Sequence, residues 1–217
     1  MTTVGGIVLC GGQSKRMGRP KAWLPFAGEI MLPRVVRLLR EAVGPIVVVA
    51  APDQAVPSLP PEVRIVRDEE KGRGPLQGLA AGLAALQGEA EAAYLSSCDV
   101  PFLKPAFVRR LIDLLGAHAI CVPRVGDYHH PLAAVYRLDV AGTVARLLAE
   151  NRLRPVFLFE TVPTRVVEAA ELADVDPTFQ TLRNLNTPED YEAALHEAAS
   201  NPEPGKITPV DPTAAER

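Results

Sequence analysis

The feature that most restricts the fold of this chain lies near its start, where a buried apolar run ends at two glycines. Residues Ile7–Leu9 are typical of a buried strand, which stops at Gly11-Gly12. A loop with another glycine and four cations follows, over residues 15–21. Glycines let backbone N–H groups approach an anion without a Cβ in the way, and lysine and arginine supply mobile charge. This pattern predicts an α/β protein that binds a phosphate group beside its first strand.

Two well-known phosphate loops do not fit the pattern. The P-loop requires G-x-x-x-x-G-K-[ST], but Gly18 is followed by Arg19 and Pro20. The dinucleotide fingerprint requires G-x-G-x-x-G, a spacing that Gly11-Gly12 does not provide. The failed fingerprint also argues against an NAD-linked dehydrogenase.

Short apolar runs alternate with amphipathic segments along the rest of the chain. Helices are predicted at 32–43, 76–86, 105–115, 140–150 and 188–199, and strands at 46–50, 63–66, 92–97, 119–123, 132–136 and 165–167. Asp139 and Thr187 are expected to cap the last two helices, whereas 155–161 has no clear period. The alternation predicts an α/β fold with a single doubly wound, mostly parallel sheet, and 124–136 predicts a small antiparallel addition.

Composition narrows the class of protein. The chain has 217 residues, of which 47% are hydrophobic and 23% charged, so we expect one domain over residues 1–200 and a flexible, proline-bearing tail over 201–217. A net charge of −3, with cations gathered at 15–21, favours a small anionic ligand over nucleic acid. Three cysteines without a C-x-x-C pair, and no long apolar run, predict a cytoplasmic protein that is not bound to a membrane.

Two carboxylates follow predicted strands at the edge where the glycine loop lies. Asp68 follows the third strand and Asp99 the fourth, and ligands of parallel sheets bind at the carboxyl ends of the strands. Because Mg²⁺ prefers one or two carboxylates together with phosphate oxygens, Asp99 is the candidate metal ligand and a catalytic residue. The alternative is that Asp99 only caps a helix or forms a turn.

The loop cations are candidates for the triphosphate. Lys21 follows Pro20, which fixes its backbone, and it could offset charge on a leaving pyrophosphate; Arg16 is the second catalytic candidate. Gly78 and Gly82 lie four residues apart on one helix face, where glycine permits either close packing on the sheet or close approach of a ligand near Gly78. Both interpretations remain open from the residues.

Four motifs resemble the molybdenum cofactor guanylyltransferase family. The pattern L-x-G-G-x-S-x-R-M-G with a later lysine is similar to residues 9–21, and the family's C-D-x-P, G-P-L-x-G and N-x-N-T-P-E-D motifs are similar to residues 98–101, 74–78 and 184–190. The resemblance implies a Rossmann-like nucleotidyltransferase, with Asn184 and Asn186 bordering the acceptor. The residues that it implies for the nucleotide are Leu9, Cys10, Gly11, Gly12, Ser14, Lys21, Asp68, Gly78 and Asp99.

The implied reaction is a Mg²⁺-dependent transfer of a nucleoside monophosphate, with GTP as donor and molybdopterin (the molybdenum cofactor) as acceptor, and with release of pyrophosphate. The chain departs from the family at Cys10, where alanine is usual, at Pro20, and at Ala50-Ala51-Pro52, where polar residues often follow the second strand. The last two departures leave open a cytidylyltransferase that uses CTP and acts on molybdopterin or a sugar-alcohol phosphate. A non-catalytic nucleotide-binding regulator is the alternative from another class. His129 and His130 stay outside the predicted catalytic set.

Overall fold

A single large sheet forms the centre of the molecule. The computed structural model describes residues 2–11, 17–68 and 72–201. Eight strands form the sheet in the order β10-β7-β9-β6-β1-β4-β5, with β8 paired to β7. The strands are β1 (Val4–Leu9), β4 (Ile46–Ala50), β5 (Arg64–Arg67), β6 (Ala92–Ser97), β7 (Ile120–Val125), β8 (Tyr128–His129), β9 (Ala133–Arg137) and β10 (Thr164–Glu168). A separate antiparallel pair consists of β2 (Pro25–Phe26) and β3 (Glu29–Ile30).

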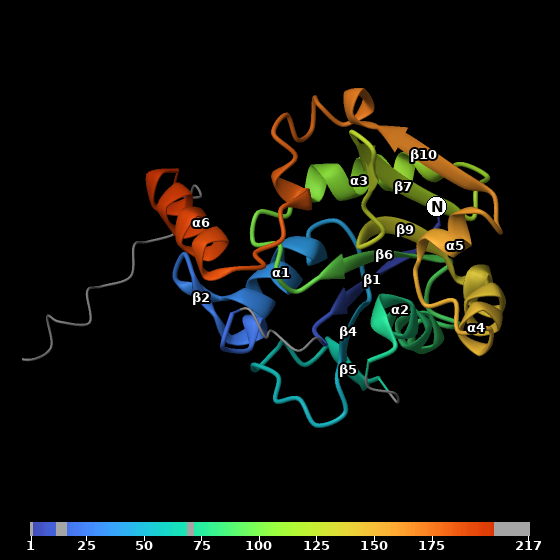
Figure 1. Cartoon of the computed structure of the whole chain (residues 1–217), viewed down its shortest axis with the longest axis horizontal. Coiled ribbons are helices and arrows are strands. Elements are labelled where there is room, and N and C mark those ends of the chain that lie inside the picture. Colours follow the sequence, from blue (N-terminus) through green and yellow to red (C-terminus); the bar gives the residue numbers. More distant parts are fainter. Residues whose placement is uncertain (1, 12–16, 69–71, 202–217) are drawn as a thin grey trace, which may run out of the picture.

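Helices cover both faces of the sheet (Figure 1). They are α1 (Met31–Arg40), α2 (Gly74–Ala85), α3 (Pro105–Leu115), α4 (Ala141–Ala149), the short α5 (Val156–Phe159) and α6 (Pro188–Ser200). One core packs α1 and α3 against the face that carries Val8, and a second packs α2 and α4 against the face that carries Ile7. A third, smaller core joins α6 to β2 through Phe26, Leu185 and Ala194.

The glycines of α2 explain how this helix lies so close to the sheet. A Cβ at Gly82 would meet Ile7 Cγ2 at 2.5 Å, and a Cβ at Gly78 would meet Leu9 Cδ2 at 2.9 Å. Real Cβ atoms do not approach neighbours this closely, so glycine is what allows α2 to rest on β1. Pro75 stands in the first turn of α2, where its missing N–H costs no hydrogen bond.

The predicted fold is confirmed, and several predicted boundaries hold to the residue. The strands 46–50 and 92–97 and the helix 105–115 have the predicted bounds. The antiparallel addition is β9, which lies inside the sheet between β6 and β7 and is antiparallel to both. The capping of the last helix by Thr187 is also confirmed, because its side chain accepts from Asp190 N.

One local prediction was wrong. Asp139 does not cap the fourth helix, because residues Leu138–Val140 form a 3-10 turn and Val140 occupies the cap position without a side-chain hydrogen bond. The segment without clear period contains the short helix α5. Most of the proposed tail lies outside the described residues. Within the part of the chain that the structure describes, no helix is both long and apolar enough to cross a membrane.

Candidate functional site

The ends of β1 and β6 bring Gly11 and Asp99 to the same edge of the sheet. These strands are parallel neighbours, with Leu9 in register with Ser97, and the Cys98 amide donates to the Leu9 carbonyl at 3.0 Å. Both strands therefore end at the same edge of the sheet, β1 toward Gly11 and β6 toward Asp99. Parallel strand order thus accounts for the meeting of two segments that are separated by almost ninety residues of sequence.

A connected set of polar side chains surrounds Asp99. Lys21 Nζ lies 2.6 Å from Asp99 Oδ2 and 2.8 Å from Asn186 Oδ1. On the other side, Asn184 Nδ2 donates to Asp99 Oδ1 at 2.7 Å and to Ser97 Oγ at 2.8 Å. We call these five residues the Asp99 cluster. Three segments far apart in sequence supply it, so the cluster exists only in the folded chain.

The donor set of the Asp99 cluster fits a hard cation. Asp99 is 7% exposed, and its two oxygens are held by an ammonium and an amide. Each carboxylate oxygen has two lone pairs, so these contacts leave acceptor capacity toward a ligand. In the described part of the chain, no three His, Cys, Asp or Glu side chains gather as a metal cage. A magnesium ion here would therefore depend on Asp99 together with phosphate oxygens and water, which is the coordination that it prefers.

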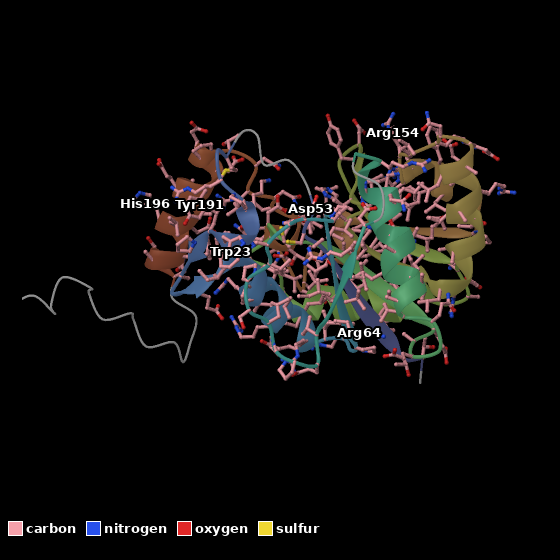
Figure 2. The ribbon with its side chains drawn as sticks, turned by 90° about the horizontal axis from the view of Figure 1, so that it is seen from below. Trp23, Asp53, Arg64, Arg154, Tyr191 and His196 are labelled. Atoms are coloured by element: carbon pink, nitrogen blue, oxygen red, sulfur yellow. The ribbon has the colours of Figure 1, made fainter. Side chains whose placement is uncertain are left out.

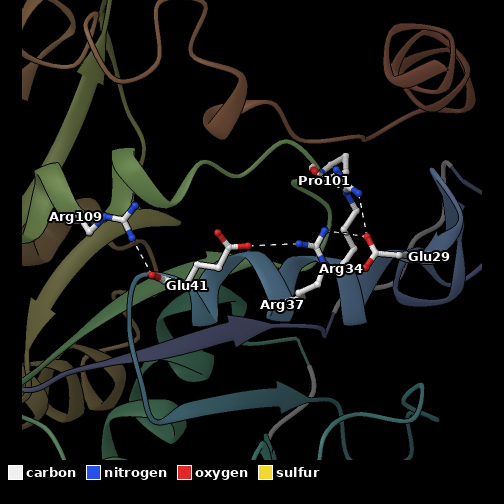
Figure 3. Close-up of polar contacts among 6 residues, drawn as sticks. All are labelled: Glu29, Arg34, Arg37, Glu41, Pro101 and Arg109. Atoms are coloured by element: carbon white, nitrogen blue, oxygen red, sulfur yellow. Dashed lines mark hydrogen bonds and ion pairs between the residues drawn. The ribbon is translucent and has the colours of Figure 1, made fainter. Parts of the chain in front are cut away.

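A buried arginine fixes the turn that carries Asp99 (Figure 3). Arg34 is 2% exposed, and its Nε donates to the Pro101 carbonyl at 2.8 Å. Glu29 neutralises this guanidinium, with its Oε2 at 3.0 Å from Arg34 Nη1, and also accepts from Arg37 Nε at 2.8 Å. Sequence reasoning did not single out Arg34, because one of three arginines along an amphipathic helix reads as a solvated side chain. Its burial makes it a positioning residue for Asp99.

Gln54 supplies a polar group just after Ala50-Ala51-Pro52, where polar residues often stand in the family. Its Nε2 donates to the Cys10 carbonyl at 3.0 Å, and its Oε1 accepts from the Ala51 amide at 3.1 Å. These bonds fasten the loop after β4 to the end of β1. Sequence reasoning missed this residue, because it lies in a proline-rich loop and belongs to no motif. Its side chain borders Cys10, one of the predicted nucleotide residues.

The remaining predicted nucleotide residues follow the same edge. Asp68 comes directly after β5, is half-buried, and its amide donates to the Ala50 carbonyl at 2.8 Å. Leu9 and Gly11 lie at the end of β1, and the closeness of Gly78 to Leu9 supports the packing interpretation of that glycine. The predicted residues Gly12, Ser14 and Arg16 lie outside the described residues.

A cavity of about 610 Å³ opens at the same edge, on the side of α2, β7 and α5. Its walls follow the ends of β5 and β7, two strands that run parallel to β1. We call it the basic cavity; its lining includes Arg73, Tyr128, His129, Arg154 and Phe159. Figure 2 shows Arg154 on one side of the molecule and Trp23 and Tyr191 on the other, with Asp53 between them.

Aromatic and imidazole groups line one wall of the basic cavity. The rings of His129 and Phe159 lie 5.6 Å apart at 51°, and Tyr128 is 77% exposed. Behind them, burial and the neighbouring His129 lower the pKa of His130, so its neutral form is favoured. The cavity therefore combines flat apolar surfaces with guanidinium groups, which suits a planar ring that carries an anionic substituent. Sequence reasoning missed the cavity as a unit, because apart from Gly74 and Pro75 of the G-P-L-x-G motif its lining comes from segments without a motif.

Comparison with known proteins places these observations in a family. The family model of the MobA-like NTP transferase domain matches residues 6–164. A probable molybdenum cofactor guanylyltransferase of Mycobacterium avium is 36% identical over 193 residues, which cover 87% of this chain and 93% of that protein.

Two solved structures share the fold. The crystal structure of molybdopterin-guanine dinucleotide biosynthesis protein A from Archaeoglobus fulgidus has a TM-score of 0.75 at 21% identity and covers 90% of this chain and 99% of its own. A Mycobacterium tuberculosis protein crystallised in complex with manganese has a TM-score of 0.59 at 22% identity and covers 90% of this chain and 99% of its own. The central sheet, the predicted loop motif and the matched residues agree, and the chain belongs to the family of MobA-like NTP transferases.

Proposed function

We propose that the chain transfers GMP from GTP to the phosphate of molybdopterin and releases pyrophosphate. The observation that carries the proposal is the Asp99 cluster, in which an ammonium, a carboxylate and two amides gather at the sheet edge where β1 ends. Transfer of a nucleotidyl group needs positioning and neutralisation of charge more than a dedicated base. The name of the Mycobacterium avium relative supports the choice of donor and acceptor.

The residues divide the work as follows in this proposal. The backbone of Gly11 and Gly12, with Ser14 and Arg16, binds the triphosphate, and Lys21 offsets the charge that grows on the leaving pyrophosphate. Asp99 would hold a divalent ion, which we take to be Mg²⁺ and which would neutralise the phosphates when bound. The manganese bound by a structural relative supports a divalent ion of this kind. Arg34 keeps the Asp99 turn in place.

Lys21, the proposed triphosphate ligand, pairs with Asp99 at 2.6 Å. A bound phosphate and metal would compete for both members of this pair. In this exchange Lys21 would trade the carboxylate of Asp99 for a phosphate, and Asp99 would trade the ammonium for the metal ion. The exchange is inexpensive, because each charge keeps a partner of opposite sign. The side-chain amides of Asn184 and Asn186 would then be free to form hydrogen bonds with molybdopterin.

The basic cavity is the proposed place of the acceptor. Molybdopterin has a planar ring system and a phosphate, and the cavity offers aromatic surfaces beside Arg73 and Arg154. Both the cavity and the Asp99 cluster lie where the parallel strands end, so an acceptor phosphate could extend from the cavity toward the donor. Asn184 and Asn186, the predicted acceptor residues, would contact that phosphate at the reacting end.

A competition assay tests the proposal. Equal concentrations of GTP and CTP are offered with Mg²⁺ and molybdopterin, and the dinucleotide product is identified by mass. We expect the guanine dinucleotide, with pyrophosphate released in equal amount and no product without acceptor. A cytosine dinucleotide as main product would favour the cytidylyl alternative, and nucleotide binding without any product would favour the regulator.

A further inference from the structure

Two of the three cysteines form a pair at the candidate site. Leu9 and Ser97 are the last residues in register on β1 and β6. Cys10 and Cys98 are the next residue after each strand, so they lie opposite each other. Neighbouring strands lie about 4.8 Å apart, which is within the Cα separation of disulfides. Cys10 and Cys98 both belong to the core that contains Val8, and the Cys98 amide donates to the Leu9 carbonyl at 3.0 Å, which holds the two strand ends side by side. Side chains in this arrangement need no change of strand register to meet.

The third cysteine provides an internal contrast. Cys121 lies on β7, where it is in register with Val135 of β9, and β9 separates it from β6. It is fully buried, whereas Cys10 is 5% and Cys98 6% exposed beside the exposed Gly11. All three cysteines are buried, and it is distance that prevents Cys121 from pairing with the other two.

We propose that Cys10 and Cys98 are a site of reversible oxidation, at which a peroxide joins the two thiols in a disulfide and lowers nucleotidyl transfer. The inhibition rests on the proposed function, whereas the disulfide does not. A pair of reduced cysteines that oxidises transiently is the usual form of a disulfide in a reducing compartment.

The chemistry balances with hydrogen peroxide as the oxidant. One thiol attacks the peroxide, and the O–O bond breaks to give a sulfenic acid and one water. The second sulfur then attacks the sulfenic sulfur, the S–O bond breaks, and a second water leaves. Two thiols and one peroxide thus become one disulfide and two waters, and a dithiol reductant reverses the bridge by exchange.

A bridge at this position would alter the site in a specific way. Gln54 Nε2 lies 3.2 Å from Cys10 Sγ and 3.0 Å from the Cys10 carbonyl, and the residue after Cys98 is Asp99. Joining the sulfurs would change the contact that fastens the β4 loop and would draw the start of the glycine loop toward the Asp99 turn. Because displacement of about 1 Å at a reacting centre can cost as much as a hundredfold, we expect about a tenfold loss of turnover.

The test treats the reduced full-length chain with hydrogen peroxide and follows thiol content, intact mass and transfer activity. Trypsin places the cysteines in three peptides, residues 1–15, 74–109 and 111–124. We expect a disulfide between the first two peptides, with the loss of two hydrogen atoms from the intact mass. Dithiothreitol should restore both mass and activity.

Substitutions separate the pair from a general effect of oxidation. Each variant is compared with itself before and after peroxide, so its own basal rate does not matter. Cys121→Ala should lose and regain activity as the unaltered chain does, whereas Cys10→Ala and Cys98→Ala should show no reversible loss. Equal reversible loss in Cys10→Ala, or peptides in which Cys10 and Cys98 remain unlinked while activity falls, would overturn the proposal. A disulfide in a chain without transferase activity would instead refute the proposed function alone.

Discussion

The Asp99 cluster and the basic cavity lie at the same edge of the sheet, but their side chains are held in different ways. In the cluster, Asp99 is bonded to Lys21 and Asn184 at 2.6 and 2.7 Å and is 7% exposed. In the cavity, Tyr128 is 77% exposed and Arg154 is also exposed, and the walls come from loops and the four-residue helix α5. The side chains of the Asp99 cluster are held by hydrogen bonds to one another, whereas the basic cavity is an open surface with exposed side chains.

This difference indicates which tasks each region can perform. Groups that act on charge in a transition state must be in place before the reaction, and the bonds of the Asp99 cluster provide this order. A surface that selects a partner can rely on shape and on a few exposed cations, and loops vary without disturbing the sheet. We therefore expect substitutions in the cluster to lower turnover, and substitutions in the cavity to weaken acceptor binding.

The largest expected effect is that of Asp99→Asn. The substitution keeps the size of the side chain but removes its charge and places an amide beside the donors Lys21 and Asn184. We expect turnover to fall by about a thousandfold, since the ligand for the metal is lost. Rates measured across a range of Mg²⁺ concentrations, with circular dichroism for the fold, check this. Asp113→Asn, an exposed carboxylate on α3, is the matched control; near-native rates in Asp99→Asn would place the metal elsewhere.

Lys21→Ala should act on the chemical step more than on binding. Charge on the pyrophosphate grows in the transition state, so loss of the ammonium should lower kcat by about a hundredfold and change KM for GTP by about threefold or less. Steady-state kinetics separate the two constants. A rise in KM with kcat unchanged would move Lys21 from the reacting centre to simple binding.

Arg154→Met tests the other side of the comparison. It keeps the apolar stem of the side chain and removes the guanidinium at the cavity. We expect KM for molybdopterin to rise about tenfold while the affinity for GTP is unchanged. Arg64→Met is the control, because Arg64 is an exposed arginine at the start of β5, away from this edge (Figure 2). Equal KM values for molybdopterin in the two variants would show that the acceptor does not bind in the cavity.

The smallest effects concern α2, which begins at the cavity and packs on the strand that leads to the cluster. A Cβ at Gly82 meets the branched and fully buried Ile7 at 2.5 Å, whereas a Cβ at Gly78 meets only the movable end of Leu9 at 2.9 Å. Gly82→Ala should therefore lower the free energy of unfolding by about 1–2 kcal/mol. Gly78→Ala should stay within about 0.5 kcal/mol, because the gain in helix propensity offsets the contact.

Urea unfolding of both variants measures this difference. If Gly78→Ala also weakens GTP binding, the predicted role of Gly78 at the nucleotide would be supported beside its packing role. Equal destabilisation by both variants would contradict the distinction between Ile7 and Leu9.

Much of the fold follows from local patterns. The run at 46–50 is continuous and β-branched, and the 3.6-residue period at 105–115 is unbroken, so both elements have the predicted bounds. That the segment over residues 10–21 and Asp99 reach the same edge was expected from the parallel strands, whereas the direct ion pair between Lys21 and Asp99 was not predicted. The role of Asp139 was mispredicted because the capping signal does not distinguish an α-helix from a preceding 3-10 turn.

Tertiary contacts lay beyond the reach of the sequence. That Asn184 would bind Asp99 directly, or that Arg34 would be buried against Pro101, depends on how the last segment and α1 cross the edge of the sheet. The basic cavity depends on the placement of loops, for which no periodicity exists. Burial of a charged residue on an amphipathic helix is likewise decided by its partner, here Glu29, and not by its own position in the pattern.

The composition of the Asp99 cluster also determines how much of a growing chain must be present before the cluster can form. β1 and β6 are neighbours although β4 and β5 are made between them, and Asn184 and Asn186 come from the last fifth of the described chain. A nascent chain that ends before residue 184 would hold Asp99 without the amide that orients it. Because a ligand stabilises only the state that it binds, substrate would protect finished molecules and leave truncated ones to proteolysis. Under the proposed function, the late asparagines would thus make acceptor binding depend on a completed chain.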